Sequence, residues 1–149
     1  MAKRSFYVKD SELDDYQVKV INRRTDNSYI VKGCAGSGKS ILALWKAKQI
    51  QEGGKGSYLY VVYTKVLCQY MSDGIKQIGL HESNVVNFDA CFHWGKNSYG
   101  KPQRGEWKKG NYDYIIVDEA QDFSKEDIEL FCSKANKALL LYGDSAQQL

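Results

Sequence analysis

A glycine-rich segment has the residue types and the spacing of a phosphate-binding loop. It reads Gly33-Cys34-Ala35-Gly36-Ser37-Gly38-Lys39-Ser40 and fits the pattern GxxxxGK[ST] in full. Glycines at this spacing let the backbone turn tightly, so that several N–H groups converge on a phosphate without a Cβ in the way. Lys39 adds a positive charge for the β- and γ-phosphates, and the Ser40 hydroxyl is a ligand that Mg²⁺ accepts. These eight residues therefore predict a site for ATP and Mg²⁺.

A second cluster of reactive side chains is acidic. Asp118-Glu119-Ala120-Gln121-Asp122 follows directly on the apolar run 114–117. An aspartate at the end of a buried strand, downstream of a phosphate loop, is predicted to hold magnesium, usually through water. The adjacent Glu119 can act as the general base that polarises an attacking water. This pair favours hydrolysis over transfer to a bound acceptor. The alternative is an acidic helix entrance that only complements the helix dipole.

The elements that position these residues alternate between strands and helices. Residues 28–31 and 58–63 are predicted strands. Each is followed by a predicted helix, over 41–51 and 66–78. The first helix has its buried face at Ile41, Leu42, Leu44, Trp45 and Ala47. The alternation predicts an α/β fold with a parallel sheet flanked by helices.

The second half of the chain continues the same pattern. Strands are predicted over 85–88, 114–117 and 138–142, and a helix over 124–135 with Ser124 as N-cap and Asp127 in a capping-box position. Residues 95–110 hold most of the glycines of this half and are predicted to be an exposed irregular loop. The basic residues of that loop, either solvated or in contact with phosphates, are Lys96, Lys101, Arg104, Lys108 and Lys109.

The composition excludes several classes of protein but does not indicate a function. The 149 residues suit one domain, and 43% hydrophobic with 26% charged residues is ordinary for a globular protein. The sequence has no apolar stretch near the ~18 residues of a membrane span and no signal peptide, so we expect a cytoplasmic protein without membrane contact. Four cysteines without a CxxC pair predict neither zinc nor disulfides. The net charge of +3 permits nucleic-acid binding but does not argue for it.

Taken in their order along the chain, these motifs resemble those of superfamily 1 helicases of the UvrD/Rep type. Residues 33–40 are similar to the family's motif I, and 118–122, which read DEAQD, to its motif II. Residues 13–17 look like the Q motif, which implies that Gln17 recognises adenine. Residues 143–147 resemble motif III, which implies that Gln147 senses the γ-phosphate and couples it to the DNA site.

Two further segments are similar to the places where this family contacts single-stranded DNA. Tyr63-Thr64-Lys65 resembles motif Ia. Residues 87–92 look like the next contact segment, although Asn87 and Asp89 stand where the family usually has Thr and His. The resemblance thus implies contacts with single-stranded DNA, or with RNA, at Tyr63, Thr64, Lys65 and Phe88. A core position stays open for Phe88, as it does for the other aromatic residues of this stretch.

The resemblance implies that residues 1–149 are the N-terminal RecA-like ATP-binding domain of such a helicase, a phosphate-loop NTPase fold truncated after motif III. In this family a second RecA-like domain supplies arginines to the γ-phosphate. Arginines of that kind contribute about 10³–10⁵ in rate, so we expect the chain alone to bind Mg-ATP but to hydrolyse it slowly. Two alternatives stay open: a nucleotide-dependent binding module without turnover, and a stand-alone NTPase or kinase with Arg104, Lys108 and Lys109 as its basic lid.

Overall fold

Five apolar runs form one parallel sheet in the part of the chain that the computed structural model describes, residues 29–33, 39–54 and 56–144. The strand order is β1-β7-β6-β2-β3, and all four ladders are parallel. The strands are β1 (Tyr29–Gly33), β2 (Tyr58–Val62), β3 (Val85–Asn87), β6 (Tyr112–Val117) and β7 (Ala135–Asp144). The predicted α/β fold with a parallel sheet is confirmed.

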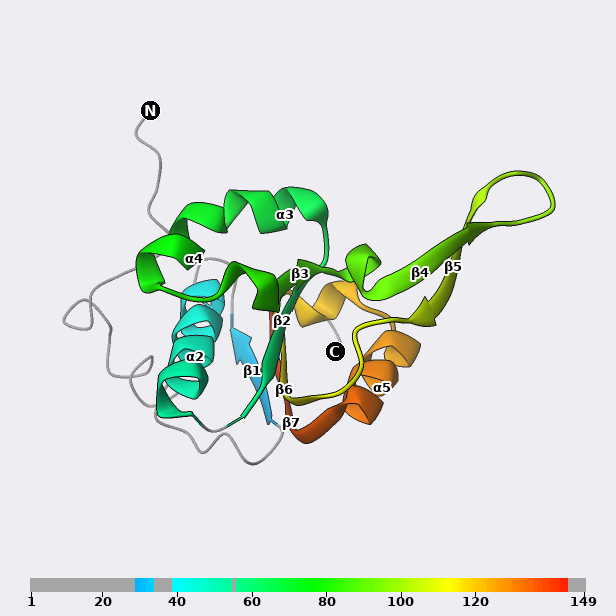
Figure 1. Cartoon of the computed structure of the whole chain (residues 1–149). Coiled ribbons are helices and arrows are strands. Elements are labelled where there is room, and N and C mark those ends of the chain that lie inside the picture. The colour runs from blue at the N-terminus through cyan, green and yellow to red at the C-terminus, as the bar shows by residue number, and fades with distance from the viewer. Residues whose placement is uncertain (1–28, 34–38, 55, 145–149) are drawn as a thin grey trace.

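Helices cover both faces of this sheet (Figure 1). One core cluster packs Tyr60 and its neighbours against α2 (Lys39–Gly53) and α4 (Ser72–Ile78). The other packs Leu59 and Ile115 against α5 (Lys125–Lys134). Alternate residues of one strand therefore enter opposite cores, as the two-residue period of a strand requires. Burial on both faces explains why these strands read as continuous apolar runs.

The predicted helix over 66–78 is wrong in its continuity, because the structure divides it into two. The first, α3 (Lys65–Tyr70), buries none of its residues, whereas α4 buries Ile75 and Ile78. Met71 stands between them and is 2% exposed. The break lets α4 pack on the core while α3 lies on the surface. Gly79 ends α4 as predicted, with a left-handed φ of 85° that favours glycine.

The first helix is confirmed, and its burial is wider than predicted. Leu42, Leu44 and Ala47 are buried, but so are Ala43 and Ile50. The other two residues assigned to the buried face, Ile41 and Trp45, are half-buried. The helix is therefore enclosed over most of its circumference.

The stretch 95–110 was predicted to be irregular, and this is wrong. It belongs to an antiparallel hairpin of β4 (Phe92–Lys96) and β5 (Pro102–Trp107) that projects from the domain (Figure 1). The Asn97 side chain builds the turn by accepting from the N–H groups of Tyr99, at 2.9 Å, and Lys101, at 3.0 Å. Gly100, with φ 74°, completes it. The predicted exposure is confirmed, since almost every residue of the hairpin is exposed.

Short 3₁₀ turns and one capped helix complete the chain. The turns are η2 (Glu82–Asn84), η3 (Phe88–Cys91) and η4 (Ala120–Asp122). The predicted capping box of α5 is confirmed: Ser124 Oγ accepts from the Asp127 N–H at 3.1 Å, and the Asp127 carboxylate accepts from the Ser124 N–H. Among the described helices, none has the length and apolar character needed to cross a bilayer.

Candidate functional site

The strand ends bring the predicted site residues to one edge of the sheet. Because all ladders are parallel, the carboxyl ends of β1, β6 and β2 lie at the same edge. β1 ends at Gly33 and α2 begins at Lys39, so the phosphate-loop segment connects a strand to a helix, as predicted. Asp118 follows β6 at this edge. Cys34 to Gly38, Gln17 and Gln147 lie outside the described residues.

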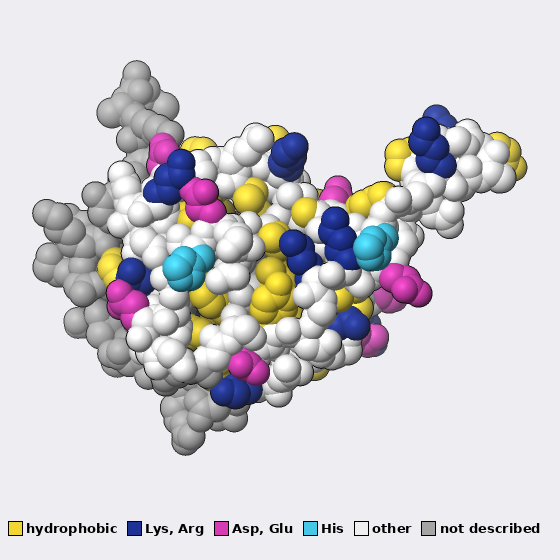
Figure 2. All heavy atoms as spheres, viewed as in Figure 1, with side chains coloured by type: hydrophobic (Ala, Val, Ile, Leu, Met, Phe, Trp, Pro, Cys, Tyr) yellow, Lys and Arg dark blue, Asp and Glu magenta, His cyan; other side chains and the backbone are white. Residues whose placement is uncertain are grey.

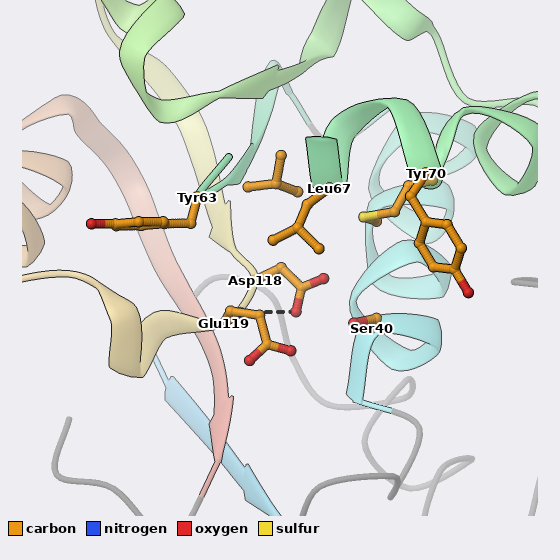
Figure 3. A pocket seen from close by; sticks show the side chains of 8 residues that line it. Ser40, Tyr63, Leu67, Tyr70, Asp118 and Glu119 are labelled. Atoms are coloured by element: carbon orange, nitrogen blue, oxygen red, sulfur yellow. Dashed lines mark hydrogen bonds between the residues drawn. The ribbon is translucent and has the colours of Figure 1, made fainter. Parts of the chain in front are cut away.

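Asp118 is buried and surrounded by hydrogen-bond donors. Its side chain is 3% exposed and faces Ser40 near the start of α2 (Figure 3). The Tyr60 hydroxyl donates to Asp118 Oδ2 at 3.0 Å, and the Glu119 N–H donates to Oδ1 at 2.9 Å. Burial raises the pKa of Tyr60 well above its ordinary value, so that the phenol keeps its proton and acts as the donor. The donors fix the plane of the carboxylate.

The electrostatic environment of Asp118 favours the binding of a cation. Burial, and to a smaller extent the charge of Glu119, raise the pKa of this carboxyl to about 6, although the hydrogen bonds from Ser40 and Tyr60 act in the opposite direction. None of the ion pairs found within the described residues includes Asp118. A buried carboxylate is costly to ionise, and a bound cation reduces that cost.

The donor set fits Mg²⁺. Ser40 and Asp118 offer oxygen atoms only, which hard cations prefer. Within the described residues there is no group of three or more His, Cys, Asp or Glu side chains that could hold a metal ion by themselves. In NTPase sites, Mg²⁺ is held by one or two protein oxygens and by the phosphates of the nucleotide. Ser40 and Asp118 are therefore the residues that would hold it.

Glu119 has an unusual backbone. Its φ of 54° and ψ of 48° are left-handed, and it is the single non-glycine residue with positive φ among residues 29–33, 39–54 and 56–144. Such a conformation costs a non-glycine residue about 1–2 kcal/mol. The Asp118 and Glu119 carboxylates both line one pocket (Figure 3), and the amide of Gln121 donates a hydrogen bond to Glu119 Oε2. The strained backbone is thus found at one of two adjacent carboxylates for which the sequence predicts different tasks.

A cavity of about 220 Å³ opens beside these carboxylates. Figure 3 shows that its wall is shared between the acidic edge and α3. The lining residues are Ser40, Val62, Tyr63, Leu67, Tyr70, Met71, Asp118 and Glu119. Two predicted catalytic residues, Asp118 and Glu119, and the beginning of the predicted DNA-contact segment, Tyr63, are therefore parts of the same pocket.

The segment 63–65 leaves the end of β2 next to that pocket. Tyr63 is 42% exposed and packs edge-to-face on Phe123, with the ring centroids 5.1 Å apart. Thr64 is the N-cap of α3, where its Oγ1 accepts from the Leu67 N–H at 3.1 Å. Thr64 and Lys65 are exposed. A helix start of this kind is accessible to a ligand, and the contact with nucleic acid stays a prediction.

Phe88 has a different environment from the one expected of a nucleic-acid contact. Its side chain is 5% exposed, and its ring makes edge-to-face contacts with Phe92, Phe123 and Phe131. A ring enclosed in this way has no free face on which a base can stack. The structure corrects the expectation and gives Phe88 the core role that the sequence had left open.

Sequence reasoning missed Tyr60 as a residue of this site. The available signal was a hydroxyl in the middle of a strand that is otherwise apolar and buried, since such a hydroxyl needs a partner. Its partner, Asp118, is 58 residues away in the sequence, and only the pairing of β2 with β6 brings the two together. Tyr60 is a positioning residue for the carboxylate.

Replacing Tyr60 with phenylalanine is expected to raise the Mg²⁺ concentration needed for nucleotide binding by about 10-fold, because outer partners of a metal ligand commonly contribute 10- to 100-fold. Tyr58→Phe is the matched control. It removes a hydroxyl two residues earlier on the same face of β2, where that group donates to Gln51 Oε1 at 2.6 Å. The measurement is a Mg²⁺ titration of fluorescent ATP binding. Equal shifts in both variants would contradict the positioning role.

Comparison with known proteins agrees with this geometry. A family model described as an AAA domain matches residues 17–149, and no curated protein matches the chain. The matched family is one of phosphate-loop ATPases, which bind nucleotide and generally take ATP with Mg²⁺. The match includes Gln17 and Gln147, two of the predicted site residues outside the described part of the structure. The chain belongs to the AAA domain family of nucleotide-binding ATPases.

Proposed function

We propose that this chain is the first RecA-like motor domain of a superfamily 1 DNA helicase or translocase of the UvrD/Rep type. Its task is to couple ATP hydrolysis to movement along single-stranded DNA. The observation that carries the proposal is the shared cavity, in which Asp118 and Glu119 form one wall and Tyr63 and Leu67 another. The order of the motifs along the chain supports it.

In the ATP site, each residue has a separate task. The phosphate-loop backbone and Lys39 bind the phosphates, and Gln17 contacts adenine. Ser40 and Asp118 would hold Mg²⁺, which when bound neutralises phosphate charge. Glu119 accepts a proton from the attacking water, and the amide of Gln121 holds its carboxylate by a hydrogen bond to Oε2. Gln147 senses the γ-phosphate.

The cavity that the two proposed sites share can couple a change at the ATP to a change at the DNA. Tyr63 and Leu67 line the cavity beside Glu119, and Thr64 between them caps α3. In this proposal, a change at the γ-phosphate that moves Glu119 reshapes the cavity that Tyr63 and Leu67 also line. The segment proposed to hold the DNA strand is the start of α3, Tyr63 to Lys65.

A second RecA-like domain completes the motor in this proposal. It would supply the arginines that contribute about 10³–10⁵ in rate in comparable systems, so the chain alone binds Mg-ATP and hydrolyses it slowly. Arg104, which a stand-alone kinase could use in a lid, is held at the hairpin instead. Its guanidinium pairs with Asp127 at 3.5 Å and lies 4.5 Å from the centroid of Phe92.

The test is the thermodynamic coupling between the two ligands. Affinity for a labelled oligo(dT) is measured by fluorescence anisotropy with and without Mg-ATP, for the wild type and for Lys39→Ala. Loss of the charged Lys39 contact is expected to weaken ATP binding by about 10-fold or more, since a charged hydrogen bond contributes ~1.5–3 kcal/mol. In the wild type, Mg-ATP should change the affinity for DNA by about 5- to 150-fold, the usual range of coupling between sites.

Each result decides between named possibilities. Coupling that disappears in Lys39→Ala supports a DNA motor. ATP binding without any binding of oligo(dT) would reject it in favour of a nucleotide-dependent module that acts on another partner. An oligo(U) of the same length distinguishes RNA from DNA. Rapid DNA-stimulated hydrolysis by the chain alone would contradict the need for a second domain.

A further inference from the structure

The β4–β5 hairpin is an exposed arm, and none of its residues lines the cavity beside Asp118 and Glu119. The base of the arm, which we call its root, is the pair Phe92 and Trp107. Phe92 is 3% exposed and packs against Trp107, and this contact fixes the root to the domain. Arg104 ties β5 to α5 through Asp127. Beyond this root, both strands and the turn are exposed, and Figure 1 shows the arm extending away from the helices. The arm therefore buries little surface of its own domain.

The arm, together with the three residues that follow β5, concentrates the positive charge of the protein. Residues 92–110 carry five basic side chains against the single acidic Glu106, a net charge of +4. The whole chain carries +3, so the remaining residues together carry −1. In the described part of the chain, the one ion pair of this segment is that of Arg104. Lys96 and Lys101, on either side of the turn, thus present their charges to the solvent.

Aromatic side chains accompany these charges. Tyr99, in the turn, is 86% exposed, and Trp94, on β4, is 48% exposed. The Trp94 indole is held in place because its Nε1 donates to the carbonyl of Asp89 at 2.8 Å. Figure 2 shows basic and hydrophobic side chains together at the far end of the arm. Lysines beside exposed rings are the pair of features that single-stranded nucleic acid requires, one for phosphates and one for bases.

The arm also begins at the edge where the motor is proposed to hold its strand. The register of the sheet pairs Val62 with Asn87, so the segment 63–65 and the root of the hairpin leave adjacent strand ends. Tyr63 and Phe88, which lies just before the hairpin, pack on the same side chain. The centroids of their rings are 5.1 and 5.0 Å from the centroid of the Phe123 ring. A strand bound at Tyr63 to Lys65 can therefore continue onto the arm.

We propose that the β4–β5 arm is a second contact for single-stranded DNA, in which Lys96 and Lys101 bind phosphates and Tyr99 stacks on an unpaired base. This inference rests on the proposed function, because it takes DNA as the partner of the motor. An acidic protein surface would also attract the lysines. It is less favoured, because the Tyr99 ring is exposed beside the lysines of the turn, and an exposed ring next to positive charge is what an unpaired base with its phosphate requires.

The test compares two arm variants with a matched surface variant. Tyr99→Ala removes the ring, while the backbone hydrogen bond to Asn97 that builds the turn remains. Lys96→Gln/Lys101→Gln removes two charges. Lys76→Gln/Lys125→Gln removes two charges from exposed positions of α4 and α5. Binding of labelled oligo(dT), and of a duplex of equal length, is measured over a range of salt concentrations.

We expect Tyr99→Ala to weaken oligo(dT) binding by about 5- to 100-fold, the effect of losing one stacked base, and to affect the duplex less. The double lysine variant of the arm should make the plot of log affinity against log salt shallower by about 1.4, which is two single-strand phosphate contacts. The control on α4 and α5 should behave as the wild type does.

Other results would overturn the inference, and they separate it from the proposed function. If the arm variants bind as the wild type does while Mg-ATP still modulates oligo(dT) binding, the arm is not a DNA contact and the motor proposal stands. If only the lysines matter and the duplex binds equally well, the arm attracts polyanions in general and single-strand recognition is rejected. If the wild type binds no DNA, the proposed function fails together with this inference.

Discussion

Glu119→Gln is expected to lower ATP hydrolysis by about 10²- to 10⁴-fold while leaving Mg-ATP binding intact, because a general base contributes this factor to the rate and not to affinity. The substitution keeps the size of the side chain and an oxygen that can accept from Gln121. It also keeps a non-glycine residue in the left-handed backbone. The fold of the site should therefore be unchanged, and the loss is confined to proton transfer.

Because we expect the chain alone to hydrolyse ATP slowly, the measurement uses single-turnover conditions. Protein in excess over labelled ATP gives single-turnover rates even when hydrolysis takes hours, and fluorescent ATP reports binding separately. Asp122→Asn is the matched control, since it makes the same carboxylate-to-amide change three residues later, at an exposed position. If Glu119→Gln hydrolyses at the wild-type rate, or if Asp122→Asn loses as much activity, Glu119 is not the base.

Asp118→Asn is expected to stabilise the nucleotide-free protein and to impair its use of Mg²⁺. Burial raises the pKa of Asp118 from 3.8 to about 6 in the folded chain. The folded state therefore binds the proton more tightly than the unfolded state does. This contribution to stability is fully present below pH 3.8 and is lost as the pH rises through about 6. An uncharged asparagine does not suffer that loss.

The expected gain in the free energy of unfolding at pH 7.5 is about 1–3 kcal/mol, since one pKa unit corresponds to about 1.4 kcal/mol. It should vanish near pH 4. Urea unfolding at both pH values, without Mg²⁺ or nucleotide, measures it, and Asp89→Asn at an exposed position is the control. The Mg²⁺ requirement for nucleotide binding should rise by about 10- to 100-fold. A loss of stability at pH 7.5 would contradict the unfavourable burial of this charge.

The elements that local sequence signals specify were predicted well. The strand 114–117 is a continuous apolar run, and the structure buries it on both faces. Ser124 and Asp127 are three residues apart, and their capping box formed as expected. Asp118 was predicted from its position after a strand, and the parallel sheet brings it to one cavity with Ser40, the last residue of the predicted phosphate loop.

The features that were missed depend on contacts between distant residues. Glycine and proline density at 95–110 read as a loop, but the pairing of Phe92 with Trp107 and the Asn97 turn make it a hairpin. The helix break at Met71 follows from the burial of that side chain, which local periodicity does not report. Tyr60 meets Asp118 only because their strands are neighbours in the sheet.

The left-handed backbone of Glu119 has a consequence for how this sequence can change over generations. Glycine and asparagine adopt that conformation at less cost, and asparagine at 118 removes a buried charge. A population selected only for folding would therefore drift away from Asp-Glu at these two adjacent positions. Retention of the pair in a descendant sequence would report selection for chemistry, and its loss would identify a copy that has kept the fold and abandoned the reaction.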